Sequence, residues 1–317
     1  MTETSADIGR MFGPGNGDQT FLGFPACAEL SELAADIAII GAPCATPYKS
    51  VGAYCAGAPA AIRAGIAGYA GVRDHQDFDL GGPLLGTSGA RVVDCGDLPY
   101  DQDDAPGNRE RIRTAVETIL ERGARPVAFG GDDSIPIPVI QAYEGRGPLT
   151  VVQIDAHIDW RDEVAGERFG LSSTMRRASE MPWVERIIQI GARAVGSARP
   201  NDYRDALDWG VSFVLAREVH ACGLDSVLEL VPEGAQVFVT LDCDGLDPWI
   251  MPAVIGPAPG GLSYWQTVDL LHGLAAKATV AGFDIVEFMP ARDIQGLAAL
   301  TAARIVCNVL GLMARGR

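Results

Sequence analysis

The chain of 317 residues carries 41 acidic and 25 basic side chains, which gives a net charge of −16 at neutral pH. This balance argues against nucleic acid or an anionic membrane as a partner, because both would be repelled. An apolar share of 48% excludes a disordered chain and predicts a large core.

Residues 1–34 are rich in Gly and Pro and are predicted to form an N-terminal arm, followed by one domain over residues 35–317. The first residues are acidic where a secretory signal would be basic, and no apolar run is expected to be long enough to span a membrane. The seven cysteines include no C-x-x-C pair, which indicates small buried side chains rather than a disulfide framework. A cytoplasmic location is predicted.

From Asp36 onward, short β-branched runs alternate with longer amphipathic ones. Strands are predicted at 37–40, 91–93, 127–129, 150–154, 186–190, 211–214, 236–241 and 280–286. Helices are predicted at 58–69, 108–123 (with Asn108 as N-cap), 172–180, 200–209, 224–230, 264–275 and 297–313. The alternation predicts an α/β fold, a three-layer α/β/α sandwich with an eight-stranded, mainly parallel sheet. A closed barrel is the alternative, and the acidic residues described next favour the open sheet.

Four predicted strands are each followed by acidic residues, with one histidine among them: Asp132 and Asp133, then Asp155, His157 and Asp159, then Asp242 and Asp244, and finally Glu287. The carboxyl ends of parallel strands meet at one edge of a sheet, so we expect these side chains to converge. Gathered carboxylates would repel one another and take up protons unless cations lay between them. The donor set favours Mn²⁺ first, then Mg²⁺, Ni²⁺ or Zn²⁺, and an Asp oxygen can bridge two ions.

Residues 130–134 (GGDDS), 155–159 (DAHID) and 242–248 (DCDGLDP) resemble the three signature motifs of the ureohydrolase family, which includes arginase and agmatinase. Residues 57–63 (GAPAAIR) resemble the family's early G-A-x-x-I-R helix, and 286–290 (VEFMP) resemble its late V-E-x-N-P segment. The chain is therefore identified as an agmatinase-like member, with residues 35–317 as an arginase-like catalytic domain.

The resemblance implies metal-dependent hydrolysis of a guanidino compound to urea and an amine, for example agmatine to putrescine and urea. It implies two Mn²⁺ ions per chain, with Ni²⁺ or another divalent ion possible, and a metal-bridging hydroxide as the nucleophile. Asp159 would move the proton to the leaving amine, and Glu287 would bind the guanidinium. A homotrimer or homohexamer is implied. The implied metal ligands are Asp133, Asp155, His157, Asp159, Asp242 and Asp244, with Asp155 and Asp242 bridging.

The chain departs from the family pattern at several positions. Asp133 stands where the G-G-D-H-S motif has a metal-binding His, so the ion there should be harder in preference, loosely held or absent. Leu171 or a neighbour stands where an H-G-T-like run would place a His, and Met289 replaces the Asn of V-E-x-N-P. Trp160 is a candidate substrate-binding residue, either as an apolar or cation-stacking wall or as a packed loop residue.

Three functions stay open at this point. The first is an agmatinase-like amidinohydrolase, because no clamp for the amino and carboxylate groups of arginine is found. The second is a hydrolase of guanidine, a substituted guanidine or a biguanide, which the missing His and the apolar Leu171 and Trp160 favour. The third belongs to another class: a paralogue with a weakened metal centre that serves as a structural subunit of a hetero-oligomer. Asp133 favours this last alternative.

Overall fold

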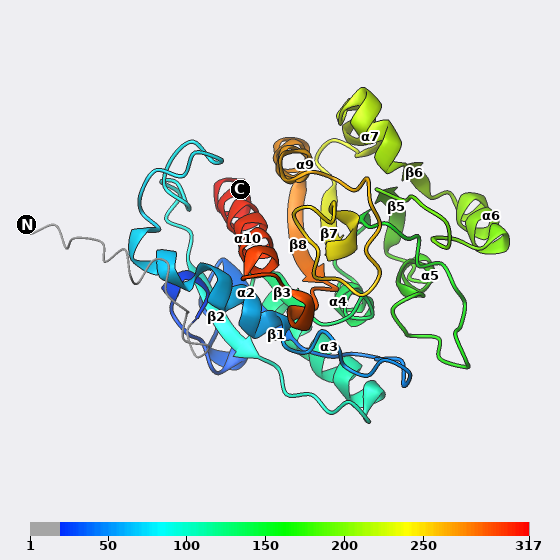
Figure 1. Ribbon diagram of the computed structural model, residues 1–317. Helices are drawn as coiled ribbons and strands as arrows, with labels where there is room; N and C mark the ends of the chain where they lie inside the picture. Colours follow the sequence, from blue (N-terminus) through cyan, green and yellow to red (C-terminus); the bar gives the residue numbers. More distant parts are fainter. Residues whose placement is uncertain (1–19, 317) are drawn as a thin grey trace, which may run out of the picture.

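The computed structural model describes residues 20–316 (Figure 1). Residues 1–19 of the predicted N-terminal arm lie outside the described part, and the division of the chain at residue 35 stays a prediction. Residues 20–34 contain two short 3₁₀ helices, η1 (Phe21–Gly23) and η2 (Leu30–Glu32). Phe21 and Phe24 are buried, and the Phe21 ring meets the ring of Phe129 edge-on at 5.3 Å.

One sheet of parallel strands forms the middle layer of the molecule, which confirms the predicted α/β/α sandwich. Its order is β2-β1-β3-β8-β7-β4-β5-β6, and every pairing is parallel. Each predicted strand is found, with its bounds displaced by no more than a few residues. The strands are β1 (Ile37–Ala42), β2 (Val92–Asp97), β3 (Arg125–Gly130), β4 (Leu149–Ile154), β5 (Val184–Ile190), β6 (Ser212–Val214), β7 (Gln236–Asp242) and β8 (Thr279–Val286).

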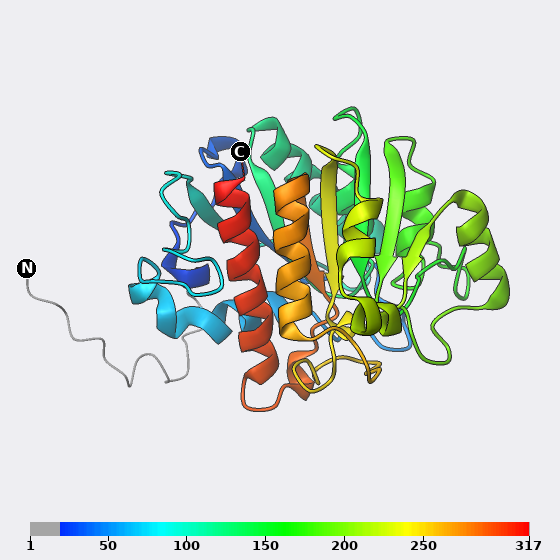
Figure 2. The same ribbon diagram turned by 90° about the horizontal axis from the view of Figure 1, so that it is seen from above.

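Helices cover both faces of the sheet (Figure 2). One face carries α2 (Ala58–Ile66), α7 (Ala216–Cys222), α8 (Asp225–Leu230), α9 (Tyr264–Lys277) and α10 (Leu297–Arg315). The other face carries α3 (Ala105–Glu121), α4 (Pro136–Gln141), α5 (Thr174–Ser179) and α6 (Pro200–Trp209). Strand β1 divides its side chains accordingly: Ile37 and Ile39 enter one core, and Ala38 and Ile40 enter the other. Further 3₁₀ helices are η3 (Ala67–Val72), η4 (Cys243–Gly245) and η5 (Pro290–Arg292).

The helix predictions were wrong in two details, the start of α3 and the absence of α7. Helix α3 begins earlier than predicted, and Asp104 caps it by accepting the N–H of Gly107. Asn108 lies inside the helix and its side chain bonds Asp101 instead. Helix α4 contains two prolines at its start, where the first turn of a helix tolerates proline. The short helix α7 was missed.

Helix α10 corrects the expectation that no apolar run approaches the length of a membrane span. Its 19 residues are long and apolar enough by length and composition, and within residues 20–316 it is the one helix that meets this criterion. Most of it is buried inside the molecule, where it packs against α2, α9 and β8. Helix α10 is therefore a core helix of this sandwich.

Candidate metal and active site

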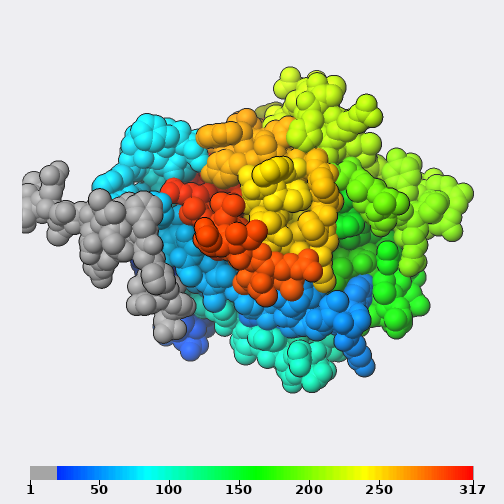
Figure 3. Space-filling view, in the orientation of Figure 1, coloured from blue at the N-terminus to red at the C-terminus, as the bar shows by residue number. Residues whose placement is uncertain are grey.

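The four strands that end in acidic residues are neighbours in the sheet, in the order β3-β8-β7-β4. Their carboxyl ends therefore meet, as the parallel arrangement predicts. Figure 3 shows this face of the molecule: blue residues after β1, yellow to red residues after β7 and β8, and green residues after β4 lie side by side. Segments that are distant in the sequence thus surround one site.

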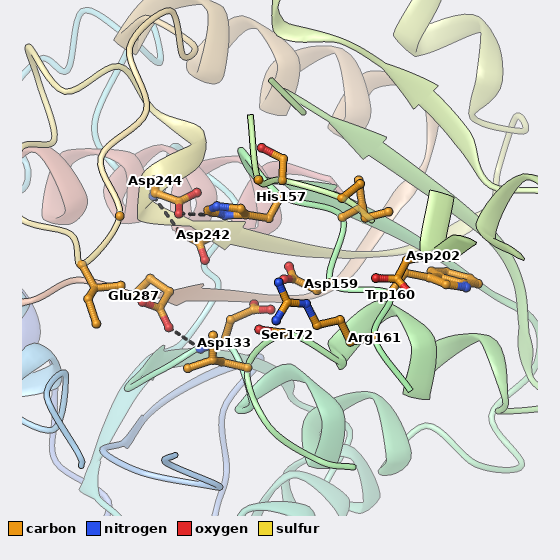
Figure 4. Close-up of a pocket in the computed structure, with 17 residues that line it drawn as sticks. Asp133, His157, Asp159, Trp160, Arg161, Ser172, Asp202, Asp242, Asp244 and Glu287 are labelled. Atoms are coloured by element: carbon orange, nitrogen blue, oxygen red, sulfur yellow. Dashed lines mark hydrogen bonds and ion pairs between the residues drawn. The ribbon is translucent and has the colours of Figure 1, made fainter. Parts of the chain in front are cut away.

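The turn after β4 and the turn after β7 are joined by hydrogen bonds. Nδ1 of His157 lies 3.1 Å from Oδ2 of Asp244 and 3.4 Å from Oδ1 of Asp155. Asp244 also accepts the backbone N–H of Ala156 at 3.1 Å, and its own N–H donates to Oδ1 of Asp242 at 2.7 Å. These contacts hold the Asp-x-His and Asp-x-Asp motifs together (Figure 4).

Two groups of potential metal ligands share one residue. The first is Asp155, His157 and Asp244, and the second is Asp133, Asp155 and Asp242; within each group the ligand atoms lie within 4.8 Å of one another. Asp155 belongs to both groups, which is the arrangement that a bridging carboxylate requires. Both carboxylate oxygens of Asp133 are buried, and neither has a hydrogen-bond partner among residues 20–316.

The electrostatics of this cluster call for positive charge. Burial, followed by the repulsion of neighbouring carboxylates, raises the pKa values of Asp133, Asp155 and Asp242 well above the usual value. Burial acts on Asp244 in the same direction, but the hydrogen bond with His157, the positive charge of His157 and the N–H of Ala156 together outweigh it and lower the pKa of Asp244. The same hydrogen bond raises the pKa of His157 to about 9. Several buried carboxylates that repel one another, together with one imidazole, form a set of ligands that fits divalent cations.

Asp159 lies beside the two groups and belongs to neither. Its Oδ2 accepts a hydrogen bond from Nε2 of Gln153 at 2.9 Å, and the same nitrogen donates to Oδ2 of Asp155 at 2.7 Å. Nε2 of Gln189 in turn donates to Oε1 of Gln153 and, at 2.9 Å, to the carbonyl of Ile158. The two glutamines therefore orient the carboxylates of Asp155 and Asp159.

Gln153 belongs to a buried polar row that crosses four strands. It is in register with Gln189 on β5 and with Thr240 on β7, and Thr240 is in register with Asp284 on β8. All four side chains are at most 1% exposed. A polar residue inside an otherwise apolar strand, two positions before a candidate ligand, is a sequence signal for Gln153 that our sequence analysis missed.

Glu287 stands at the end of β8 beside the second group. Its carboxylate accepts the Tyr54 hydroxyl at 2.7 Å and the backbone N–H of Asp133 at 2.9 Å. Burial, followed by the charge of Asp132, raises the pKa of Glu287 to about 8. Tyr54 was not predicted, and no pattern in the loop before α2 singles it out. Glu287 is thus a fixed acceptor with a single side-chain donor among the described residues.

A cavity of about 230 Å³ opens over this cluster. Its inner part is lined by Asp133, Asp159, Asp242, Asp244 and Glu287, together with His157. Its outer part is lined by Arg161, Leu171, Ser172, Asp202 and Ile255, among others. The cavity therefore offers an acidic inner end and a mixed outer end.

Trp160 borders this cavity, but its indole does not form a wall for a ligand. It is 2% exposed and packs against the ring of Trp209 at a centroid distance of 6.1 Å, within the core on the α3 side. Of the two interpretations of Trp160, the structure supports the packed loop residue, because the chain turns its large apolar side chain inward. Leu171 does line the cavity, whereas Met289 contributes a backbone N–H to the carbonyl of Ala253.

Arg193, which our sequence analysis did not single out, ties the loops around the site together. Its guanidinium donates to the carbonyls of Asp244 at 2.6 Å, Leu246 at 3.3 Å and Ala258 at 2.6 Å. Asp247 shapes the adjoining turn by accepting the N–H of Trp249 at 3.0 Å. The loop that presents Asp244 is consequently held by its backbone.

Comparison with known proteins gives consistent matches. The model of the Arginase family matches residues 35–311. The mitochondrial agmatinase of Gallus gallus is 33% identical over 228 residues, which are 69% of this chain and 66%, just under two thirds, of that protein. An N(1)-aminopropylagmatine ureohydrolase of Thermus thermophilus is 35% identical over 218 residues, 68% of this chain and 71% of that protein. The structure of proclavaminate amidino hydrolase from Streptomyces clavuligerus superposes with a TM-score of 0.78 at 27% identity, covering 94% of this chain and 98% of that one.

Proposed function

The chain belongs to the arginase family, whose members are hydrolases of C–N bonds in linear amidines, and on that premise we propose that it hydrolyses a small guanidino compound to urea and an amine. The observation that carries this proposal is the convergence of Asp133, Asp155, Asp242, Asp244 and His157 below one cavity, with Glu287 beside them. A guanidinium is planar and cationic, and an acidic cavity of this size suits it.

Agmatine, which would give putrescine and urea, is the first substrate to test, because one relative described above is named an agmatinase and another is named for an aminopropyl derivative of agmatine. Guanidine, a substituted guanidine or a biguanide is the second candidate. Leu171 in the cavity wall supports it, since an apolar side chain there suits a compact or alkylated ligand.

Two divalent ions fit the donor set, and we propose Mn²⁺, with Ni²⁺ as the alternative. Asp155, His157 and Asp244 would hold one ion, and Asp133, Asp155 and Asp242 would hold the other. The unpartnered oxygens of Asp133 support the second site, because they lie close to the carboxylates of Asp155 and Asp242, and a shared cation would offset the repulsion among the three. When bound, the ions supply a water that is activated as a nucleophile at neutral pH.

The chain's own residues would orient the substrate and move the proton. Glu287, fixed by Tyr54, would pair with the guanidinium and hold its carbon over the acidic end of the cavity. Asp159 accepts Gln153 through one oxygen, which leaves its other oxygen to take up a proton and pass it to the leaving amine. Asp159 is thus proposed as a proton carrier rather than as a member of either ligand group.

A homotrimer or homohexamer in the cytoplasm is the assembly we propose. A hetero-oligomer in which this chain is a structural subunit with a weakened centre is the alternative of another class, and Asp133 is the observation that favours it. The free state of all cysteines in the described chain is compatible with a reducing compartment.

The test is urea release from agmatine, guanidine and a biguanide by the purified chain, with Mn²⁺ or Ni²⁺ added, alongside metal quantification by mass spectrometry. We expect urea with Mn²⁺ from at least one compound. Glu287→Gln should lower kcat/KM by about 10- to 100-fold, because a charge-assisted hydrogen bond contributes about 1.5–3 kcal/mol. Tyr54→Phe, which keeps the charge of Glu287, should cost only several-fold.

Two results would count against parts of this proposal. Absence of urea and of bound metal would leave the structural subunit. Two tightly held zinc or nickel ions per chain would contradict the preference for a harder ion that Asp133 predicts.

A further inference from the structure

Arg161 lines the cavity, and its side chain is directed toward the acidic residues rather than away from them (Figure 4). We propose that Arg161 anchors a carboxylate at the far end of the substrate, so that the preferred substrates are ω-guanidino acids. This inference rests on the proposed function and narrows its substrate class. Agmatine ends in an ammonium group, whereas an ω-guanidino acid ends in a carboxylate, a group of opposite charge.

The guanidinium of Arg161 is without a partner in the part of the chain that the structure describes. It makes no hydrogen bond there and lies within 4 Å of no carboxylate oxygen. Its backbone is fixed, because its N–H donates to the carbonyl of Ser172 at 3.0 Å, and Ser172 also lines the cavity. An ordered backbone that carries an unpaired guanidinium into a cavity is arranged for an anionic ligand.

Three other arginines near the site, Arg168, Arg177 and Arg193, make contacts within the protein. Arg168 and Arg177 donate to Asp162 at 3.1 and 2.6 Å, on the outer side of the same loop. Arg193 donates to backbone carbonyls. Arg161 is adjacent to Asp162 in sequence and yet takes no part in that network of ion pairs. The structure thus leaves this one cation of the loop for the cavity.

Asp202 is the residue that argues for the opposite choice, because its carboxylate also lines the outer cavity and would suit an ammonium group. Asp202 lies in the first turn of α6, where a carboxylate is stabilised by the exposed N–H groups of the helix start. Its presence therefore has an explanation that needs no ligand. The guanidinium of Arg161 has no hydrogen-bond or ion-pair partner among the described residues, so we let its positive charge decide between the two tails.

The experiment compares three guanidines that carry four carbon atoms beyond the guanidino group. The tail of 4-guanidinobutyrate ends in a carboxylate, that of agmatine ends in an ammonium group, and that of butylguanidine is uncharged. Urea release by the metal-loaded protein is measured for the wild type, Arg161→Leu and Arg161→Lys. Arg168→Leu is the matched control, because it removes a nearby arginine that does not line the cavity. Metal affinity and thermal stability are measured for each variant.

We expect 4-guanidinobutyrate to have a kcat/KM at least about tenfold above that of agmatine. Arg161→Leu should lower kcat/KM for 4-guanidinobutyrate by about 10- to 100-fold, mainly through KM, because the tail lies away from the reacting carbon. It should leave butylguanidine unchanged, and Arg161→Lys should recover part of the loss. Arg168→Leu should change none of the three.

Equal loss for all three compounds, or a changed metal affinity in Arg161→Leu, would overturn the anchor and make Arg161 a counter-charge for the acidic cluster. Faster hydrolysis of agmatine would overturn it in favour of Asp202, while the hydrolase function would stand. If no compound releases urea, the proposed function fails separately. Calorimetry then decides the anchor: equal or absent binding of 4-guanidinobutyrate to the wild type and to Arg161→Leu would overturn it.

Discussion

Glu287 and Asp159 have backbone φ angles of 64° and 41°, in the left-handed region that non-glycine residues seldom adopt. Both follow buried strands, and surrounding contacts hold them there. The N–H of Glu287 donates to the carbonyl of Gly131 at 2.8 Å, and the carbonyl of Asp159 accepts the N–H of Arg176 at 3.2 Å. Strained backbone of this kind persists where packing over-determines it, and it is frequent at functional sites. Glu287, proposed to bind the substrate, and Asp159, proposed to transfer the proton, are thus the two acidic residues of the site with a strained backbone conformation.

Asp284 makes the stability of the protein depend on pH. It is fully buried in β8, and burial raises its pKa to about 8, whereas an unfolded aspartate titrates near 3.9. Between these values the unfolded chain releases a proton that the folded chain keeps. The free energy of unfolding should therefore fall as pH rises from about 4 to about 8, by up to about 1.4 kcal/mol per pH unit.

Asp284→Asn removes this titration while keeping the shape of the side chain. We expect the variant to gain stability relative to the wild type between pH 5 and pH 8, as measured by urea unfolding at both values. The exposed Asp208→Asn serves as the control for the loss of any carboxylate. An identical difference between Asp284→Asn and wild type at the two pH values would contradict this assignment.

At the scale of elements, the site depends on how closely the turn after β7 approaches the end of β4. A Cβ atom on Gly245, in η4, would lie 2.8 Å from the backbone N of Asp155 and from the backbone of Ile154. Only glycine fits between the two strand ends. Any larger residue must move the motif that carries Asp242 and Asp244 away from Asp155.

Gly245→Ala should therefore weaken Mn²⁺ binding by at least about tenfold and cost about 1–3 kcal/mol of stability. Metal titration calorimetry and urea unfolding measure the two effects. Gly71→Ala is the matched control, because a Cβ at Gly71 meets nothing within 4 Å. If Gly245→Ala binds metal as Gly71→Ala does, the close approach does not govern the site.

The strands and their acidic ends were predictable because a parallel sheet buried on both faces demands apolar runs, and its carboxyl edge gathers whatever follows them. The directions of loop side chains were not predictable in this way. Trp160 turns into the core and Arg161 into the cavity, and nothing in their adjacent positions distinguishes the two fates. Tyr54 reaches Glu287 across more than two hundred residues of sequence, a contact that only the folded loop creates.

At the scale of the whole molecule, Arg63 joins three distant parts of the chain. From α2 it forms two hydrogen bonds to Asp94, at 2.8 and 2.9 Å, and a third to Asp97, both in β2. Asp94 also accepts the N–H of Phe21 at 2.7 Å. Arg63 is 6% exposed and Asp94 is 1% exposed, so this is a buried ion pair with its hydrogen bonds satisfied.

Arg63→Met should lower the free energy of unfolding by about 3–5 kcal/mol, because it leaves the charge of Asp94 buried without a partner. The double variant Arg63→Met/Asp94→Asn should recover a substantial part of that loss. Urea unfolding of both variants and the wild type provides the measurement. A double variant no more stable than the single one would mean that lost packing, rather than the orphaned charge, is the cause.

Strand β8 is the last strand along the chain, yet it lies between β3 and β7 in the middle of the sheet. Until it inserts, β3 and β7 present two open edges, and the acids after β3 have no neighbour from β7. Such non-local pairing is slow to form, and unpaired strand edges are prone to associate with other chains. The newly made protein should therefore pass through a stage in which the two parts of the sheet on either side of β8 are formed but not yet joined, and no catalytic centre exists. A high concentration of other chains at that stage, rather than low stability of the finished fold, would limit the yield of folded protein.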